Sequence, residues 1–283
     1  SRLSAARDSG SWTRSRAATD RIVMLLTIDI GNTTISVGVF QGKRICQTYT
    51  LETVCPRRQM VVRLMKVFKS ISRSSVSIQG IVICSVVPQA LLVVESTVRK
   101  EMKIRPWVVG RDIKVPIRNN YRNPRQVGQD RLVGAYAAKC LYGSPCLIID
   151  FGTAITLDVV SRRGDYEGGM IIPGIRLSAE SLFQKTALLP RIEKIAPPRL
   201  LIGKETKESI LSGIFHGYGA MCSELIDRIT KEIRGQPKVI LTGGHTDLIK
   251  KFISRKIDKI DRHLVFKGMY LLSLPNKKSL DKN

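Results

Sequence analysis

The sequence predicts an α/β fold of two similar lobes. The chain has 283 residues, a length that suggests two domains or one domain with two lobes, and 43% are hydrophobic, enough for a sizeable core. Two segments of the same pattern lie 121 residues apart, which is too long for a solenoid repeat but suits a duplicated domain. No apolar stretch reaches the about 18 residues that a membrane helix needs, so we expect no membrane span.

Each of the two repeated segments predicts a β-hairpin. They cover residues 25–40 and 146–160, and both show an apolar run, then Asp-x-Gly followed by Asn or Thr, then alternating apolar and polar residues. Glycine lets such a turn bring backbone N–H groups against a phosphate, and an aspartate at the strand end can hold the metal that screens the phosphate charge. An ordinary tight turn explains either segment alone, but the recurrence of the pattern favours two turns that bind one nucleotide between them.

A third element fits the same ligand. Residues 238–241 predict a strand, and Thr242-Gly243-Gly244 follows as a turn against which a base or ribose can lie. Other phosphate-binding loops are missing, because the sequence has no G-x-x-x-x-G-K-[ST] and because Gly217-Tyr218-Gly219 lacks the third glycine of a dinucleotide fingerprint. P-loop enzymes and Rossmann dehydrogenases are therefore excluded.

The segment between the hairpins carries a candidate acceptor site. Residues 132–141 predict a helix, so Asp130 and Arg131 come at its start, where backbone N–H groups and the macrodipole favour anions. A carboxylate there can take the proton of an attacking hydroxyl, and the neighbouring guanidinium can bind a substrate carboxylate. An N-cap aspartate beside a surface arginine explains these residue types equally well.

The cysteines and histidines indicate no metal site. The six cysteines include no C-x-x-C pair, and Cys84 and Cys146 fall in predicted core strands. This pattern indicates buried thiols in a reducing compartment rather than a disulfide framework or a zinc site. His216, His245 and His263 have no partner at metal-ligand spacing and are expected to be structural or surface residues.

The chain is strongly basic, with 47 Lys and Arg against 23 Asp and Glu and a formal net charge of +24. Blocks such as residues 56–58 and 118–125 can bind nucleic acid, but aromatic residues make up only 6% of the chain and no nucleic-acid motif accompanies the blocks. A solvated basic surface that attracts small anions or acidic partners is favoured. Residues 1–23, rich in Arg and Ser, are interpreted as an extension expected to be disordered, with a transit-type segment as the alternative.

Seven motifs in series resemble those of type III pantothenate kinases, and the resemblance runs from residue 24 to about residue 267. The motifs are Asp-x-Gly-Asn-Thr at 29–33, Gly-x-Asp-Arg at 128–131, Asp-Phe-Gly-Thr-Ala-x-Thr at 150–156, Gly-Gly-x-Ile-x-Pro-Gly at 168–174, Thr-Ala-x-Leu-Pro at 186–190, Gly-x-x-Thr-x-x-Ser-Ile-x-x-Gly at 203–213 and Leu-Thr-Gly-Gly at 241–244.

The resemblance implies the two-lobed ribonuclease H-like fold of actin-like ATPases, in which duplicated mixed β-sheet domains are flanked by helices. It further implies ATP-dependent phosphorylation of pantothenate to 4'-phosphopantothenate, the first step of coenzyme A biosynthesis, by a cytoplasmic homodimer that uses Mg²⁺ and a monovalent cation, K⁺ or NH₄⁺. The lobes are expected at residues 24–141 and 142–275, followed by a basic tail at 276–283. A non-catalytic regulatory factor of the same fold, binding nucleic acid through its basic surface, is the alternative.

The resemblance also implies the site residues. Asp130 is the implied general base, Asp29 lies near the magnesium, and Asp150 binds the monovalent cation. Residues 168–174 are expected to form a tight turn close to the active site and the dimer interface. The implied ATP contacts are Asp29, Ile30, Gly31, Asn32, Thr33, Thr34, Ile35, Ser36 and Thr153. The implied pantothenate contacts are Tyr121, Gly128, Gln129, Asp130, Arg131 and Thr186, the last of them near the dimer interface.

Overall fold

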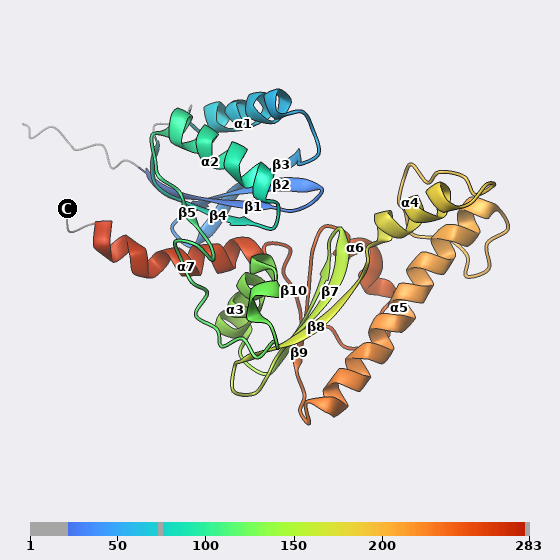
Figure 1. Ribbon diagram of the computed structural model, residues 1–283. Coiled ribbons are helices and arrows are strands. Elements are labelled where there is room, and N and C mark those ends of the chain that lie inside the picture. Colours follow the sequence, from blue (N-terminus) through green and yellow to red (C-terminus); the bar gives the residue numbers. More distant parts are fainter. Residues whose placement is uncertain (1–21, 73–75, 281–283) are drawn as a thin grey trace, which may run out of the picture.

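Two five-stranded β-sheets organise the protein, one in each of two lobes (Figure 1). The computed structural model describes residues 22–72 and 76–280, so most of the predicted N-terminal extension lies outside the described residues. The first lobe comprises β1 (Ile22–Ile30), β2 (Thr34–Gln41), β3 (Arg44–Glu52), α1 (Arg57–Ser72), β4 (Val76–Ser85), α2 (Pro88–Met102) and β5 (Trp107–Val108). The chain continues through η1 (Pro124–Gln126), α3 (Gln129–Tyr142), β6 (Cys146–Phe151), β7 (Ala154–Val160), β8 (Tyr166–Pro173), α4 (Ile175–Lys185), α5 (Thr206–Glu232), β9 (Lys238–Thr242), α6 (Thr246–Ile249), η2 (Lys250–Phe252), β10 (Lys259–Ile260) and α7 (Leu264–Leu280).

The two sheets have the same topology. Their strand orders are β3-β2-β1-β4-β5 and β10-β9-β6-β7-β8. β1 pairs antiparallel with β2 and parallel with β4, and β6 likewise pairs antiparallel with β7 and parallel with β9. Asp29 lies opposite Ser36 in the first hairpin, and Asp150 lies opposite Thr156 in the second. The predicted hairpins and the predicted duplication of a mixed sheet are therefore confirmed.

The outer face of each sheet is apolar and covered by helices. In the first lobe, Leu26 and Ile28 of β1 pack with Leu64 of α1 and Val94 of α2. Side chains alternate between the faces of a strand, so Thr27 and Asp29 point the other way, toward the second lobe.

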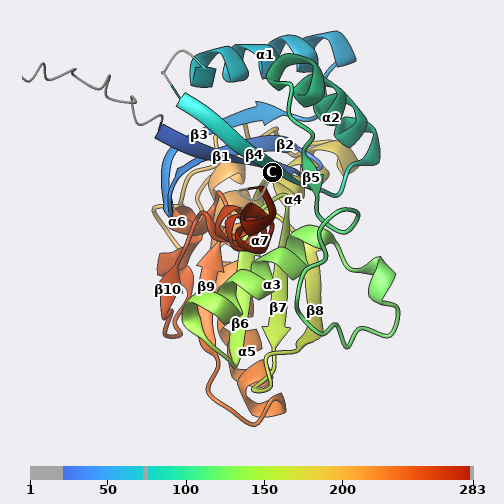
Figure 2. The ribbon, with the colours of Figure 1, turned by 90° about the vertical axis from the view of Figure 1, so that its left-hand side faces the viewer.

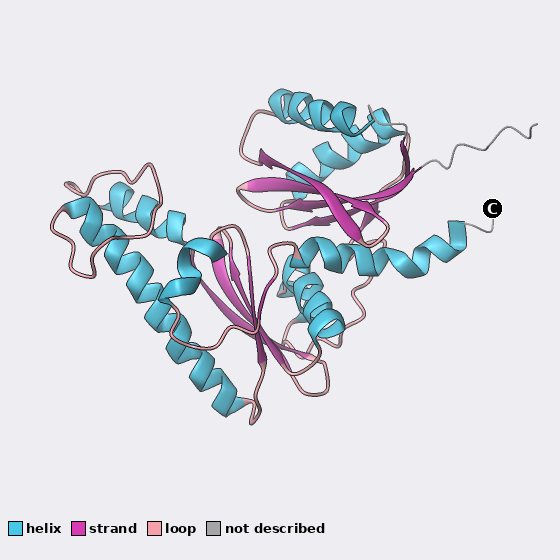
Figure 3. Ribbon diagram, turned by 180° about the vertical axis from the view of Figure 1, so that it is seen from behind, coloured by secondary structure: helices cyan, strands magenta, loops and turns pink. Residues whose placement is uncertain are grey.

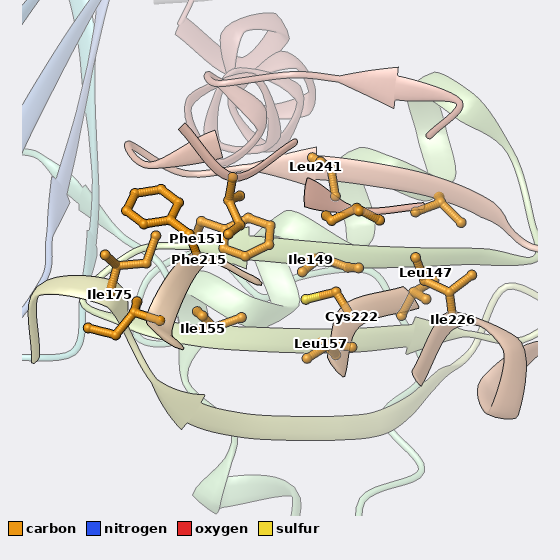
Figure 4. Packing of buried hydrophobic residues seen from close by; sticks show 14 of the residues in the cluster. Leu147, Ile149, Phe151, Ile155, Leu157, Ile175, Phe215, Cys222, Ile226 and Leu241 are labelled. Carbon is orange, nitrogen blue, oxygen red and sulfur yellow. The ribbon is translucent and has the colours of Figure 1, made fainter. Parts of the chain in front are cut away.

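The second sheet repeats this arrangement. Leu147, Ile149 and Phe151 of β6 pack against α5, whose Phe215 and Cys222 reach into the same core (Figure 4). Figure 3 shows α5 along one side of the sheet and α3 on the opposite side. The alternation again leaves Asp150, beside Ile149 and Phe151, on the inner face.

Helices α3 and α7 lie between the two sheets (Figure 2). Ala135 and Ala138 of α3 pack with Ile148 on the inner face of the second sheet. Phe266 and Met269 of α7 pack on the first sheet, so the last helix of the chain returns to the first lobe. The boundaries placed at residues 141 and 275 stay predictions, and the expected tail at 276–283 begins inside α7.

One predicted element is wrong. Residues 168–174 form most of strand β8 and not a tight turn, since β8 pairs antiparallel with β7 from Tyr166 to Pro173. The glycines permit a close approach: a Cβ on Gly169 would lie 1.8 Å from the carbonyl oxygen of Leu157. Glycine content predicts turns when it supplies a positive φ, but here it mainly makes room for a neighbouring strand.

The cysteine prediction is confirmed in part. Cys84 and Cys146 are buried in strands as expected, and Cys222 is buried in α5, while Cys46 and Cys140 are exposed. All six cysteines carry free thiols. Within residues 22–72 and 76–280, no helix is long and apolar enough to cross a membrane.

Candidate active site

A cleft of about 460 Å³ separates the inner faces of the two lobes. It brings together the ends of both hairpins, the start of α3 and the turn after β9, which are far apart in the sequence. The predicted turn at Thr242, Gly243 and Gly244 lines the same cleft. The predicted site residues that line it are Asp29, Gly31, Asn32, Thr34, Ser36, Asp130, Arg131, Asp150 and Thr153.

The two hairpin turns face each other across the cleft. The hydroxyl of Thr153 donates a hydrogen bond of 2.9 Å to the hydroxyl oxygen of Thr33, which joins the lobes at this point. Gly31 N–H donates to the Thr34 carbonyl, and Gly152 N–H donates to the Ala154 carbonyl, so these two amides close the turns themselves. A phosphate bound at this site would therefore depend on the other amides and on the hydroxyl and amide side chains of the turns.

Asp29 and Asp150 occupy equivalent positions on the two lobes, each near the end of the first strand of its hairpin. Burial, together with the negative charge of Asp130, raises the pKa of Asp29 to about 7. The same two causes raise the pKa of Asp150 to about 7. The carboxylates of Asp29 and Asp150 are therefore near the negative charge of Asp130 without a compensating positive charge among the described residues. A bound cation would provide that charge.

The residues present fit cations that phosphates help to bind. Four aspartates line the cleft, at positions 29, 130, 150 and 158, against two arginines, Arg131 and Arg262. In the described part of the chain, no three His, Cys, Asp or Glu side chains form a ready-made metal cage. Magnesium is usually held by one or two carboxylates plus substrate phosphates and water, so an incomplete protein cage matches its chemistry.

Asp130 lies in the first turn of α3, as predicted. Its Oδ1 accepts a hydrogen bond of 2.8 Å from the backbone N–H of Arg131. Burial raises the pKa of Asp130, which makes its ionised form a stronger base. Gly128 makes this arrangement possible, because a Cβ there would lie 2.4 Å from the same Oδ1.

Arg131 is not a surface residue, and its partner is one that the sequence analysis missed. Its Nε donates a hydrogen bond of 2.8 Å to Oδ1 of Asp158 in β7, and the two side chains are 9% and 4% exposed. Asp158 also accepts hydrogen bonds from Tyr166 and Thr156. The alternation of side chains along β7 could have predicted this position of Asp158. Thr156 and Asp158 lie on the same face of the sheet as Asp150 of β6.

Several predicted contacts lie outside the cleft of the single chain. The side chains of Ile30 and Ile35 are buried in the outer core of the first lobe, so only their backbone atoms can serve a ligand. The side chain of Gln129 packs against Gly110. Gly128 is the N-cap residue of α3, and Tyr121 packs over Gly168 of β8. Thr186 follows α4, on the far side of the second sheet from α3, where its hydroxyl donates to the Leu182 carbonyl.

Two further features of the cleft escaped sequence analysis. His263, expected to be structural or at the surface, lines the cleft beside Arg262. Gly174, the N-cap residue of α4, supports the second turn from behind: its N–H donates to the Thr153 carbonyl at 3.1 Å, and a Cβ there would lie 2.2 Å from that oxygen. Only the packing of α4 on the hairpin reveals this contact.

Sequence comparison identifies the family. Residues 25–228 match the family model described as type III pantothenate kinase. The chain belongs to the type III pantothenate kinase family. It is 43% identical over 251 residues to a type III pantothenate kinase of Persephonella marina, covering 87% of this chain and 97% of that protein. A type III pantothenate kinase of Bacillus cytotoxicus is 39% identical over 253 residues, covering 88% of this chain and 95% of the relative. The family assignment does not favour the alternative of a non-catalytic regulatory factor.

Solved structures confirm the fold expected of this family. The activator of 2-hydroxyisocaproyl-CoA dehydratase from Clostridium difficile, with bound ADPNP, has a TM-score of 0.53 and 14% identity, covering 92% of this chain and 98% of that one. A ROK family glucokinase from Streptomyces griseus, in complex with glucose and AMPPNP, has a TM-score of 0.51 and 13% identity, covering 87% and 97%. At these identities the likeness shows the actin-like ATPase fold alone.

Proposed function

We propose that the protein transfers the γ-phosphoryl group of ATP to the primary hydroxyl of pantothenate, the first step of coenzyme A biosynthesis. The observation that carries this proposal is one cleft, in a member of the type III pantothenate kinase family, that Asp130 lines together with two facing hairpin turns. Phosphoryl transfer asks a protein mainly to align the acceptor with the γ-phosphate and to stabilise charge.

The reaction assigns a distinct task to each part of the cleft. The hairpin turns at residues 31–34 and 152–154 bind the phosphates, and the turn at 242–244 receives the adenosine. Asp130 takes the proton of the pantothenate hydroxyl as its oxygen bonds to the γ-phosphorus and ADP leaves. Arg131 binds the pantothenate carboxylate, which fixes the orientation of the substrate.

We assign Mg²⁺ to the neighbourhood of Asp29 and a monovalent cation, K⁺ or NH₄⁺, to Asp150. The excess of carboxylates over arginines in the cleft supports both assignments, because a triphosphate entering it would otherwise meet net negative charge. When bound, the cations neutralise phosphate charge. The chain's own contribution is to hold the two carboxylates at the ends of β1 and β6.

We further propose a homodimer formed through the surface of β8, α4 and the loop after α4. Nine of the fifteen large hydrophobic side chains exposed in the described part of the chain lie between residues 170 and 202. β8 is an edge strand, whose Ile171 is 65% exposed, and exposed apolar edges tend to pair with another chain. Thr186 follows α4 in this region, so a second copy would explain how it reaches a pantothenate site. The cytoplasmic localisation stays a prediction.

The test is ADP release from the purified protein with ATP and Mg²⁺, with and without pantothenate, in potassium and then in sodium. We expect turnover that requires pantothenate, is abolished by a chelator, and falls when sodium replaces potassium. Turnover that is independent of pantothenate would contradict the substrate assignment. Equal rates in potassium and sodium would contradict only the role of Asp150.

A further inference from the structure

Asp158 and the two hydroxyl groups that bind it form a buried cluster beside Arg131, on the inner face of the second sheet. Asp158 is 3% exposed, and its Oδ1 accepts a hydrogen bond of 2.8 Å from the hydroxyl of Tyr166. Its Oδ2 accepts one of 2.9 Å from the hydroxyl of Thr156. Both donors belong to the same sheet, on β8 and β7, so they fix the carboxylate to a rigid element. Buried networks whose members are satisfied hold a single geometry.

The guanidinium of Arg131 is fixed by this carboxylate along one side only. Nε donates to Oδ1 of Asp158, and Nη2 lies 2.8 Å from the same oxygen. Nη2 therefore forms an ion pair with Asp158, but within the described residues this buried nitrogen makes no hydrogen bond. It lies against Gly169, where a Cβ would be 2.9 Å away. A guanidinium has five donors in one plane, so fixing one side also fixes the direction of the others.

A buried N–H group that makes no hydrogen bond is costly unless a ligand accepts one from it. Arg131 lines the cleft next to Asp130, where the acceptor substrate must bind for its hydroxyl to meet the base. A carboxylate is the natural complement of guanidinium donors, because its two oxygens match their spacing.

We propose that Asp158, held by Tyr166 and Thr156, is a positioning residue that aims Arg131 at the carboxylate of pantothenate. Asp158 thereby sets the preference for a carboxylate substrate without touching it. The inference rests on the proposed function and deepens it, since it names the group that recognises one end of the substrate.

Orientation and charge predict opposite results when Asp158 loses its charge. If Asp158 positions the guanidinium, Asp158→Asn releases Arg131 and weakens binding of the substrate carboxylate. If Asp158 only neutralises Arg131, the same substitution unmasks the positive charge and strengthens that binding. The sign of the change in KM therefore separates the two roles.

The experiment measures kcat and KM of the full-length protein for pantothenate and for its alcohol analogue, in which a hydroxymethyl group replaces the carboxylate. The variants are Asp158→Asn and the milder Tyr166→Phe, which keeps the charge of Asp158 and removes one hydrogen bond. Asp227→Asn is the matched control, because Asp227 forms an exposed pair with Arg255 on the outside of the second lobe. Melting temperatures of all variants are recorded.

We expect Asp158→Asn to raise KM for pantothenate roughly tenfold or more, as the loss of an aligned charge-assisted pair predicts. We expect kcat to stay within about threefold and kcat/KM for the alcohol to change little, because only carboxylate binding is affected. Tyr166→Phe should shift KM in the same direction by less, and Asp227→Asn should match the wild type.

An unchanged or lower KM in Asp158→Asn would overturn the proposal. Equal losses for pantothenate and its alcohol would also overturn it, since a merely structural role affects both substrates. If Asp158→Asn does not fold, Tyr166→Phe decides: an unchanged preference for pantothenate refutes positioning. Absence of pantothenate-dependent turnover in the wild type would instead refute the proposed function.

Discussion

Gly174→Ala tests whether the contact behind the turn at residues 152–154, which we propose to bind phosphate, is required. An added Cβ would lie 2.2 Å from the carbonyl oxygen of Thr153 and 2.6 Å from that of Gly152. Ordinary carbon–oxygen contacts are about 1 Å longer. Both oxygens belong to the backbone, so a change of side-chain rotamer cannot relieve the overlap. The turn or the start of α4 must therefore move.

The expected magnitude follows from that overlap. Forcing an extra carbon into a packed site costs typically about 1 to 3 kcal/mol, and we expect the upper part of that range here. A displacement of about 1 Å at the proposed ATP contact of Thr153 can lower the rate as much as a hundredfold, so kcat/KM for ATP should fall by about ten- to a hundredfold. Urea denaturation and steady-state kinetics measure the two effects.

Gly213→Ala is the matched control. Gly213 is exposed within α5, and nothing lies within 4 Å of an added Cβ, so alanine should stabilise the protein by about 0.5 to 1 kcal/mol. Gel filtration should show the same oligomeric state for this control and for the wild type. If Gly174→Ala has wild-type stability and wild-type kcat/KM for ATP, the second turn does not depend on its packing against α4.

Three further predictions concern the proposed general base, the proposed cation ligand and the proposed dimer interface. Asp130→Asn should lower kcat about a hundredfold while KM for ATP stays constant, since loss of a general base typically costs that much; unchanged turnover would refute the role. Because the pKa of Asp150 is raised to about 7, the folded state binds its proton more tightly than the unfolded state, and the metal-free protein should lose about 1 kcal/mol of stability between pH 6 and 8 from this group. Urea midpoints at the two pH values should show a smaller loss for Asp150→Asn, and an identical loss would contradict the cause assigned. Ile171→Lys should shift sedimentation from dimer to monomer, because it places a charge on the exposed edge strand β8; a wild-type profile would place the interface elsewhere.

Local pattern predicted the framework of the protein. The apolar runs ending in Asp-x-Gly predicted both hairpins, and their recurrence predicted two lobes of the same topology. The helix at the start of which Asp130 lies followed from composition. These features depend on residues close in sequence, whose periodicity and turn chemistry are visible without the fold. The same motifs also predicted the family that the comparison confirmed.

Tertiary structure decided which of these residues share a site and what each one touches. Asp158 and Arg131 are 27 residues apart in the chain, and they become partners because α3 packs against the face of β7 that carries Asp158. Gly168 and Gly169 proved to belong to strand β8 and not to a tight turn, and Gly169 allows the close approach of the neighbouring strand. The family resemblance implies that Thr186 and Asp130 both contact pantothenate. Thr186 nevertheless follows α4, on the opposite side of the second sheet from Asp130. A sequence motif fixes residue types and spacing, whereas distances between distant segments arise only when the sheets and helices bury their apolar faces against one another.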